Sequence, residues 1–149
     1  MRARKTKLGV ILLVAAWSLP LDVSAQELPD EPGPLEDHAA FLKLRPGYQD
    51  CLDAAGGAMP TMIRCNGAEY TYQDKRLNTV YRKLIREVTS DDRRSLVAEE
   101  RDWIAKKEKD CAMPMGAGQG DILDASNCLV TYIARRATVL ERRLGPAVR

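Results

Sequence analysis

Four cysteines, Cys51, Cys65, Cys111 and Cys128, are the residues whose type and spacing say most about chemistry. Zinc sites usually contain two cysteines only a few residues apart, and no such pair occurs in this chain. An even number of cysteines in a short exported chain is typical of disulfide bonds, which persist in oxidising compartments. We therefore expect two disulfides rather than a metal site or a catalytic thiol.

Groups that could catalyse a reaction are scarce. The chain has a single histidine, His38, so a histidine-based triad, a two-histidine metal site and an HExxH helix are excluded by count. The sequence also contains no GxSxG elbow, no phosphate-binding glycine loop and no dinucleotide fingerprint. Carboxylate pairs such as Asp91-Asp92 and Glu99-Glu100 fit helix starts and solvated helix faces. We expect neither an enzyme nor a bound cofactor or metal.

Residues 1–25 have the three-part organisation of a secretion signal. Four basic residues precede an apolar run over residues 8–19, and Val23-Ser24-Ala25 offers small residues to a signal peptidase. The apolar run is shorter than the roughly 20 residues that a membrane-spanning helix needs. We therefore expect cleavage near Ala25 and a periplasmic or secreted mature protein without stable membrane insertion.

The charge of the chain is unevenly distributed, although 23 Lys and Arg nearly balance 21 Asp and Glu. Residues 26–47 form an expected leader that is rich in proline and acidic, with no Lys or Arg before Lys43. From Lys43 onward, basic residues outnumber acidic ones by four. These basic residues are not clustered with aromatic residues as in nucleic-acid-binding domains. We therefore do not expect a nucleic-acid partner.

Residues 48–144 are expected to form one helical domain. Apolar residues at three- and four-residue steps predict helices over about 60–88 and 91–111, and a last helix that starts at about 121. A short helix is expected over residues 35–44, ended by Pro46. Short connections favour antiparallel neighbours. The predicted fold is all-α, a small disulfide-stapled antiparallel helical bundle with a long central helix.

Three disulfide connectivities are possible for four cysteines. A Cys51–Cys65 bond would tie a short leading helix to the start of the long helix. A Cys111–Cys128 bond would bridge the loop over residues 113–120, which is rich in glycine and proline. Each bond would contribute about 3 kcal/mol in the chain-entropy model. We favour this arrangement, while crossed pairing stays compatible with the sequence.

Two residues within the apolar stripes have both a structural and a functional interpretation. Asn78 follows Leu77 and lies on or beside the inner face of the long helix. A buried asparagine must satisfy up to four hydrogen bonds, so it either fixes the register of neighbouring helices or contacts a partner. Trp103 either anchors the core or forms part of a binding surface. We expect Trp103 in the core, because tryptophan is highly buried on average.

Several residues recur at a recognisable spacing. The first half of the pattern consists of Cys51-Leu52, Met62, Cys65, Glu69, Asp74, Leu77-Asn78 and Tyr81. The second half consists of Leu96, Ala98, Trp103-Ile104, Cys111, Cys128-Leu129, Arg136 and Leu140. This pattern resembles the LprI-type lysozyme inhibitor domain family over about residues 48–144. The resemblance implies an exported helical protein that binds and blocks lysozyme.

The chain departs from the family pattern around the tryptophan. Glu100 stands where the family usually has Gln, and Lys106-Lys107-Glu108 stand where it usually has Tyr-Arg-Asp. If this turn contacts a partner, the specificity of this chain differs from that of its relatives. The candidate partner-binding residues are Asp74, Asn78, Trp103, Lys106, Lys107 and Glu108.

The leading hypothesis is an exported, non-enzymatic binding protein of the lysozyme-inhibitor class, whose partner is lysozyme or another envelope protein. An acidic face would favour binding to cationic C-type lysozymes, whereas the body of this chain is basic. The alternative is a structural or envelope-stress protein that binds anionic cell-wall or lipid components, although such charge is also ordinary on helix exteriors. The basic residues that motivate it are Arg82, Lys83, Arg86, Arg135, Arg136, Arg142 and Arg143.

Overall fold

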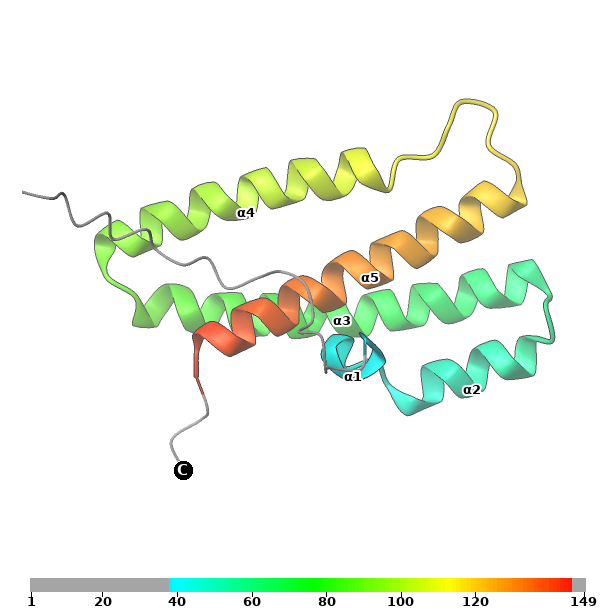
Figure 1. Ribbon diagram of the computed structural model, residues 1–149, viewed down its shortest axis with the longest axis horizontal. Helices are drawn as coiled ribbons and strands as arrows, with labels where there is room; N and C mark the ends of the chain where they lie inside the picture. The colour runs from blue at the N-terminus through cyan, green and yellow to red at the C-terminus, as the bar shows by residue number, and fades with distance from the viewer. Residues whose placement is uncertain (1–37, 146–149) are drawn as a thin grey trace, which may run out of the picture.

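The computed structural model describes residues 38–145 as a bundle of α-helices (Figure 1). The helices are α1 (His38–Leu42), α2 (Pro46–Ala55), α3 (Met59–Glu87), α4 (Ser90–Asp110) and α5 (Gln119–Arg143). The predicted all-α fold with a long central helix is confirmed. The expected signal sequence, its cleavage site near Ala25 and the first part of the acidic leader lie outside the described residues.

None of the helices over residues 38–145 is both long enough and apolar enough to cross a membrane.

The ends of the helices follow local sequence signals. Pro60 lies in the first turn of α3, where its missing N–H costs nothing. Thr89 caps α4, because its hydroxyl accepts a hydrogen bond of 3.2 Å from the amide of Asp92. The α5 helix begins two residues before the predicted start. There the Asp121 carboxylate accepts a hydrogen bond of 2.8 Å from the amide of Gly118, so Asp121 caps from inside the first turn.

The prediction that Pro46 ends the first short helix is wrong. The α1 helix already ends at Leu42, and Lys43 follows with a φ of 52°, a left-handed conformation that interrupts a right-handed helix. Pro46 is instead the first residue of α2. Proline suits that position, because its fixed φ is compatible with a helix start and its missing N–H would have no partner there.

The main hydrophobic core lies between α3 and α5. Its buried members are Leu77, Val80, Leu84, Leu96, Ile133, Ala137 and Leu140. Tyr70, Tyr81 and Ile85 of α3, and Val88 directly after it, pack against this cluster. The apolar stripe predicted for the long helix is therefore confirmed. Because burying one large aliphatic side chain contributes about 1.5–3 kcal/mol, the contact between α3 and α5 is the principal source of stability.

The α1 helix is fastened to α5 at the end of the expected leader. Phe41 and Leu42 are 1% and 3% exposed. The Thr138 hydroxyl donates a hydrogen bond of 2.9 Å to the carbonyl of Phe41, and Arg76 donates one of 3.0 Å to the carbonyl of Leu42. The α1 helix is therefore packed as part of the described bundle.

Three polar side chains of α3 are fully buried, and the sequence reasoning did not single out two of them. Asn66, Glu69 and Gln73 are each 0% exposed. The Glu69 carboxylate accepts hydrogen bonds of 2.7 Å from Arg45 and 2.8 Å from Gln73. The Tyr48 hydroxyl donates one of 2.9 Å to Asn66. Each buried group is thus satisfied, as its desolvation requires, and the bonds fasten α2 and the residues before it to α3.

Two disulfides close the bundle at one end. Cys51 of α2 is bonded to Cys65 of α3, and their Cα atoms are 5.9 Å apart. Cys111, directly after α4, is bonded to Cys128 of α5, and their Cα atoms are 5.5 Å apart. The favoured pairing is confirmed, and all four cysteines are used.

The α4 helix is attached to the bundle mainly by ion pairs and by the connections at its two ends. Leu96 is its single buried residue. From α5, Arg136 contacts Glu99 at 2.7 Å and Glu100 at 2.6 Å, and Arg143 forms two hydrogen bonds of 2.7 Å with Glu99. The α4 helix therefore depends on ion pairs along its length, on the short turn after α3 and on the Cys111–Cys128 disulfide.

Acid should weaken this attachment. Burial raises the pKa of Glu99, but hydrogen bonds and charges from Arg143 and Arg136 outweigh that effect and hold the pKa below its usual value. Because the folded pKa is the lower one, Glu99 contributes stability above its unfolded pKa of about 4.3. That contribution is lost as the pH falls through the folded pKa.

We therefore expect the free energy of unfolding of the wild type to decline more steeply below about pH 4.3 than that of Glu99→Gln. Urea denaturation at several pH values, followed by circular dichroism, measures both. The Glu99→Gln variant keeps every other carboxylate, so it shows how much they contribute to the pH dependence of stability. An equal decline in the two proteins would contradict this role of Glu99.

Candidate functional site

A groove between α3 and α4 is the best candidate for a partner-binding site. It has a volume of about 340 Å³. Leu77 and Tyr81 of α3 and Val97 and Ile104 of α4 contribute to its lining, and Ile133 of α5 completes it. The groove exists because α4 buries little of its own surface against the bundle, so apolar side chains between the two helices stay accessible.

Four of the six candidate residues from the sequence line this groove. They are Asp74, Asn78, Trp103 and Lys107. The remaining two, Lys106 and Glu108, are exposed on α4 but do not line the groove. Helical periodicity explains the division, because residues 103 and 107 are one turn apart and share a face that residues 106 and 108 do not.

Trp103 is half-buried at the boundary between the core and the groove. It packs against the apolar cluster of α3 and α5. The Nζ atom of Lys107 lies 5.4 Å from the ring centroid, and the guanidinium carbon of Arg136 lies 5.9 Å from it. Both cations are within the range of a cation–π interaction. Trp103 is thus a core contact, as expected, but it also presents part of its surface to the groove.

Asn78 is exposed, so its interpretation as a buried residue that fixes helix register is wrong. Its side-chain amide donates hydrogen bonds of 2.9 Å to the carbonyl of Asp74 and 3.0 Å to the Asp74 carboxylate, one turn earlier on α3. The buried polar role on α3 belongs to Asn66, Glu69 and Gln73 instead. Asp74 and Asn78 form a polar pair at the groove.

Glu100, which lines the groove, is paired with the buried Arg136 of α5. Arg136 is 3% exposed, and its Nε and Nη2 atoms donate hydrogen bonds of 2.8 and 2.6 Å to one oxygen of Glu100. In the sequence, both residues occur at three- and four-residue steps from the apolar residues of their helices. Oppositely charged residues at such inward-facing positions indicate a buried ion pair. We did not draw that inference from the sequence, where Glu100 stood out only as a departure from the family pattern.

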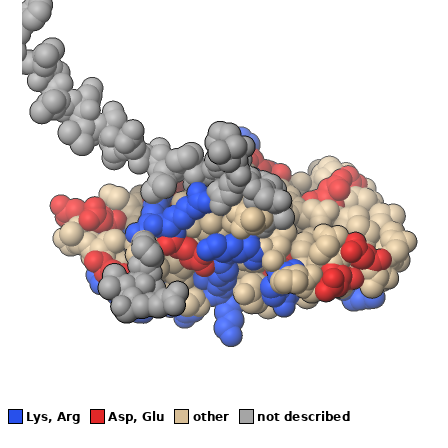
Figure 2. Space-filling model, turned by 60° about the horizontal axis from the view of Figure 1, so that its bottom comes forward, with Lys and Arg blue, Asp and Glu red and all other residues tan. Residues whose placement is uncertain are grey.

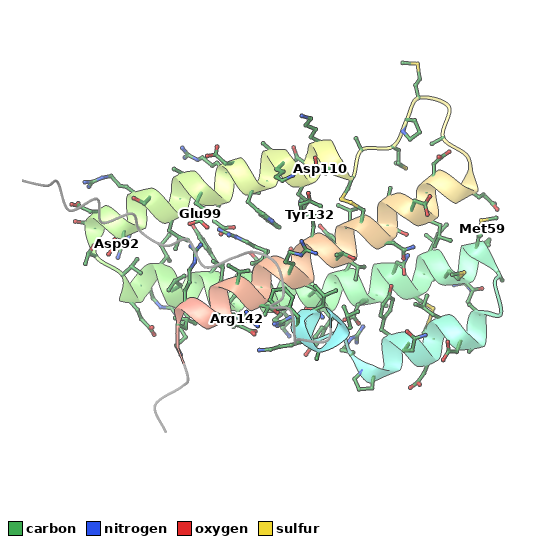
Figure 3. The ribbon with its side chains drawn as sticks, viewed as in Figure 1. Met59, Asp92, Glu99, Asp110, Tyr132 and Arg142 are labelled. Atoms are coloured by element: carbon green, nitrogen blue, oxygen red, sulfur yellow. A yellow bond between two sulfur atoms is a disulfide. The ribbon has the colours of Figure 1, made fainter. Side chains whose placement is uncertain are left out.

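A second polar cluster joins the end of α4 to α5. Asp110 accepts hydrogen bonds from Lys106 and from the hydroxyl of Tyr132. Figure 3 shows Asp110 of α4 and Tyr132 of α5 close together between the two helices. The hydrogen bond from Lys106 is the main cause that lowers the pKa of Asp110, and the bond to Asp110 likewise raises the pKa of Lys106. Lys106 is therefore exposed but paired with Asp110, and it does not line the groove.

The basic residues that motivated the alternative function are divided by the fold. Arg136 is buried in its ion pairs, and Arg143 is bonded to Glu99. The guanidinium carbon of Arg142 lies 4.6 Å from the centre of the Phe41 ring. Arg82, Lys83 and Arg86 stay exposed on α3. Figure 2 nevertheless shows Lys and Arg gathered over the middle of one face of the molecule.

The groove offers groups suited to recognition. It combines an indole, a phenol and aliphatic side chains with carboxylate, amide, ammonium and guanidinium groups. An apolar anchor surrounded by polar groups is typical of the centre of a protein–protein interface. Among residues 38–145, no group of three or more His, Cys, Asp or Glu is placed to hold a metal ion.

The sequence of the chain matches one protein-family model. Residues 51–140 match the model of the lysozyme inhibitor LprI family. The chain belongs to the LprI lysozyme inhibitor family. The matched segment of this LprI-family chain runs from within α2 to near the end of α5. It contains both disulfides and all the residues that line the α3–α4 groove.

Searches of curated proteins and of solved structures found no match to the chain. The LprI family is non-enzymatic in general. The resemblance inferred from the cysteine, Leu-Asn and tryptophan spacing is therefore confirmed at the level of the family.

Replacing the tryptophan tests its role in the core of this LprI domain. Because Trp103 is only half-buried, Trp103→Ala should lower the free energy of unfolding by about 2 kcal/mol, less than the ~3–5 kcal/mol of a fully buried tryptophan. Trp103→Phe is the matched control and should recover part of the loss. Thermal and urea denaturation measure both variants. A loss near zero for Trp103→Ala would show that the ring does not support the core.

Proposed function

We propose that this protein is exported, that it is not an enzyme, and that it binds lysozyme and lowers its activity. The observation that carries this proposal is the match of residues 51–140 to the LprI lysozyme inhibitor family. The two disulfides support export, because such bonds persist in oxidising compartments. The proposed location is the periplasm or the exterior of the cell.

We further propose the α3–α4 groove as part of the surface that contacts lysozyme. Trp103 is central to this surface, and large aromatic side chains in partly desolvated pockets are frequent hot spots of interfaces. Asp74 and Asn78 lie on one wall and Lys107 on the other, where they can bind charged or polar groups of a partner. Lys106 and Glu108, exposed on the same helix, would contribute at the edge.

The groove is better suited to binding than to hydrolysis. A glycosidase requires one carboxylic acid and a partner carboxylate that face the same cleft. Asp74 accepts a hydrogen bond from Asn78, and Glu100 is neutralised by Arg136 within its ion pair. Each of these two carboxylates therefore already has a polar partner within the protein.

Lysis of cell walls by purified lysozymes tests the proposed function. Addition of the mature protein, from residue 26 onward, should slow lysis by a C-type lysozyme in proportion to its concentration. A G-type lysozyme, assayed in parallel, reports the class that is recognised. The protein with both disulfides reduced and alkylated is a control for non-specific effects. Unchanged lysis with both lysozymes at tens of micromolar inhibitor would contradict the proposal.

One observation favours the second candidate function, the binding of anionic envelope components. A groove of about 440 Å³ lies on the other side of α3. Its lining includes Lys75, Lys83, the Arg76–Glu141 ion pair and the apolar residues Val80 and Leu144. A cationic rim beside apolar surface is suited to an anionic amphiphile.

Sedimentation with vesicles separates this candidate from the first. If the second candidate holds, vesicles with anionic headgroups should retain the protein at low salt and release it at high salt. The Lys75→Glu/Lys83→Glu variant should be retained less, while neutral vesicles should retain neither protein. Equal retention of the variant and the wild type would remove this groove as the binding site.

A further inference from the structure

We propose that the loop between α4 and α5, residues 112–118, enters the substrate cleft of the lysozyme that this protein binds. This inference rests on the proposed function and adds to it the element that produces inhibition. The loop projects from one end of the bundle, beyond the last turn of α4 (Figure 1). Four observations support it: exposed apolar side chains, local order, charge and shape.

The loop carries the most exposed large apolar side chains of the described residues. Met115 is 104% exposed and Met113 is 56% exposed. Met59 and Ile122, each 38% exposed, begin the neighbouring helices α3 and α5 at the same end of the molecule, where Figure 3 labels Met59. Contiguous exposed apolar residues mark interaction sites, and flexible methionine side chains adapt to the shape of a partner.

The loop is held in one conformation, although its side chains are exposed. The amide of Ala117 donates a hydrogen bond of 3.1 Å to the carbonyl of Pro114, which closes a turn with Met115 at its second position. Gly116, at the third position, has a φ of 80°, which only glycine adopts easily. The Cys111–Cys128 disulfide ties the base of the loop to α5. Such pre-organisation lowers the entropic cost of binding.

The charge around the loop is negative, although the body as a whole is basic. Residues 111–130 contain Asp121 and Asp124 and no Lys or Arg. Residues 48–67, which form most of α2 and the start of α3 at the same end, contain two aspartates and one arginine. Figure 2 shows this end as mostly uncharged, with acidic areas and a few basic atoms at its lower edge, whereas most Lys and Arg gather over the middle.

This separation of charge identifies the kind of partner. An acidic surface favours a cationic one, because complementary potentials steer the encounter and suppress wrong partners. C-type lysozymes are cationic, and the acidic face that their inhibitor needs is present at the loop end. This acidic face was not evident from the sequence, because the net charge of the body is positive.

Shape distinguishes the loop from the α3–α4 groove. The active site of a lysozyme is a concave cleft that holds a polysaccharide chain, so a convex element must fill it to exclude the substrate. The groove is concave and can hold only a projection of the partner. The loop is convex and apolar at its apex. We infer that the loop blocks the cleft and that the groove contributes affinity.

Substitution of the two exposed methionines tests the proposal. Met115 and Met113 have few contacts to lose, so Met113→Ser/Met115→Ser should melt at the temperature of the wild type. The concentration of this variant that halves the activity of C-type lysozyme should rise tenfold or more. Tyr72→Ser, which removes a 44% exposed aromatic from the middle of α3, is the matched control and should inhibit as the wild type does.

The outcomes distinguish this inference from the proposed function. If the wild type inhibits lysozyme and the double methionine variant inhibits equally well, the loop is excluded while the proposed function stands. If both substituted proteins weaken equally, the effect is not specific to the loop and the inference fails. If the wild type neither inhibits nor binds lysozyme in titration calorimetry, the proposed function fails and this inference fails with it.

Discussion

Arg136 projects from α5 to the inner side of α4, where its guanidinium group contacts Glu99 and Glu100 within 2.7 Å. Because Leu96 is the single buried residue of α4, this ion pair is one of the main contacts along that helix, beside the Arg143–Glu99 pair and the packing of Trp103. A buried charge without its partner is strongly destabilising, by about 3–5 kcal/mol. The position of α4 and the width of the groove beside it therefore depend on Arg136, together with the Arg143–Glu99 pair and the Cys111–Cys128 disulfide.

The bundle divides stability and recognition between different helices. The α3 and α5 helices form the core, and hydrogen bonds that Asn66 and Glu69 accept from Tyr48 and Arg45 attach α2 and the residue before it to α3. The α4 helix contributes little apolar burial, which leaves side chains such as Trp103 and Ile104 accessible to a partner. Regions with few buried contacts are the ones that open most readily. The disulfide at Cys111 limits such opening and keeps the proposed binding surfaces in place.

Much of the fold could be predicted from the sequence, because helical periodicity and cysteine spacing are local signals. The stripe containing Leu77 and Leu84 and the pairing of Cys111 with Cys128 are examples. The exposure of Asn78 could not be predicted in this way. Periodicity assigns a residue to a helix face but does not separate the edge of an apolar stripe from its centre. The polar partners of Glu69 and the acidic loop end depend on segments distant in sequence, which only the packed structure brings together.

The central claim, that the loop end contacts lysozyme, can be measured directly with methyl-labelled methionine. After loss of Met1 with the signal sequence, the mature protein would retain Met59, Met62, Met113 and Met115, so its methyl NMR spectrum is simple to assign. Titration with unlabelled C-type lysozyme should shift or broaden the signals of Met113 and Met115. The signal of Met62, half-buried on α3, should stay unchanged. Binding of lysozyme that leaves both loop signals unperturbed would contradict the account.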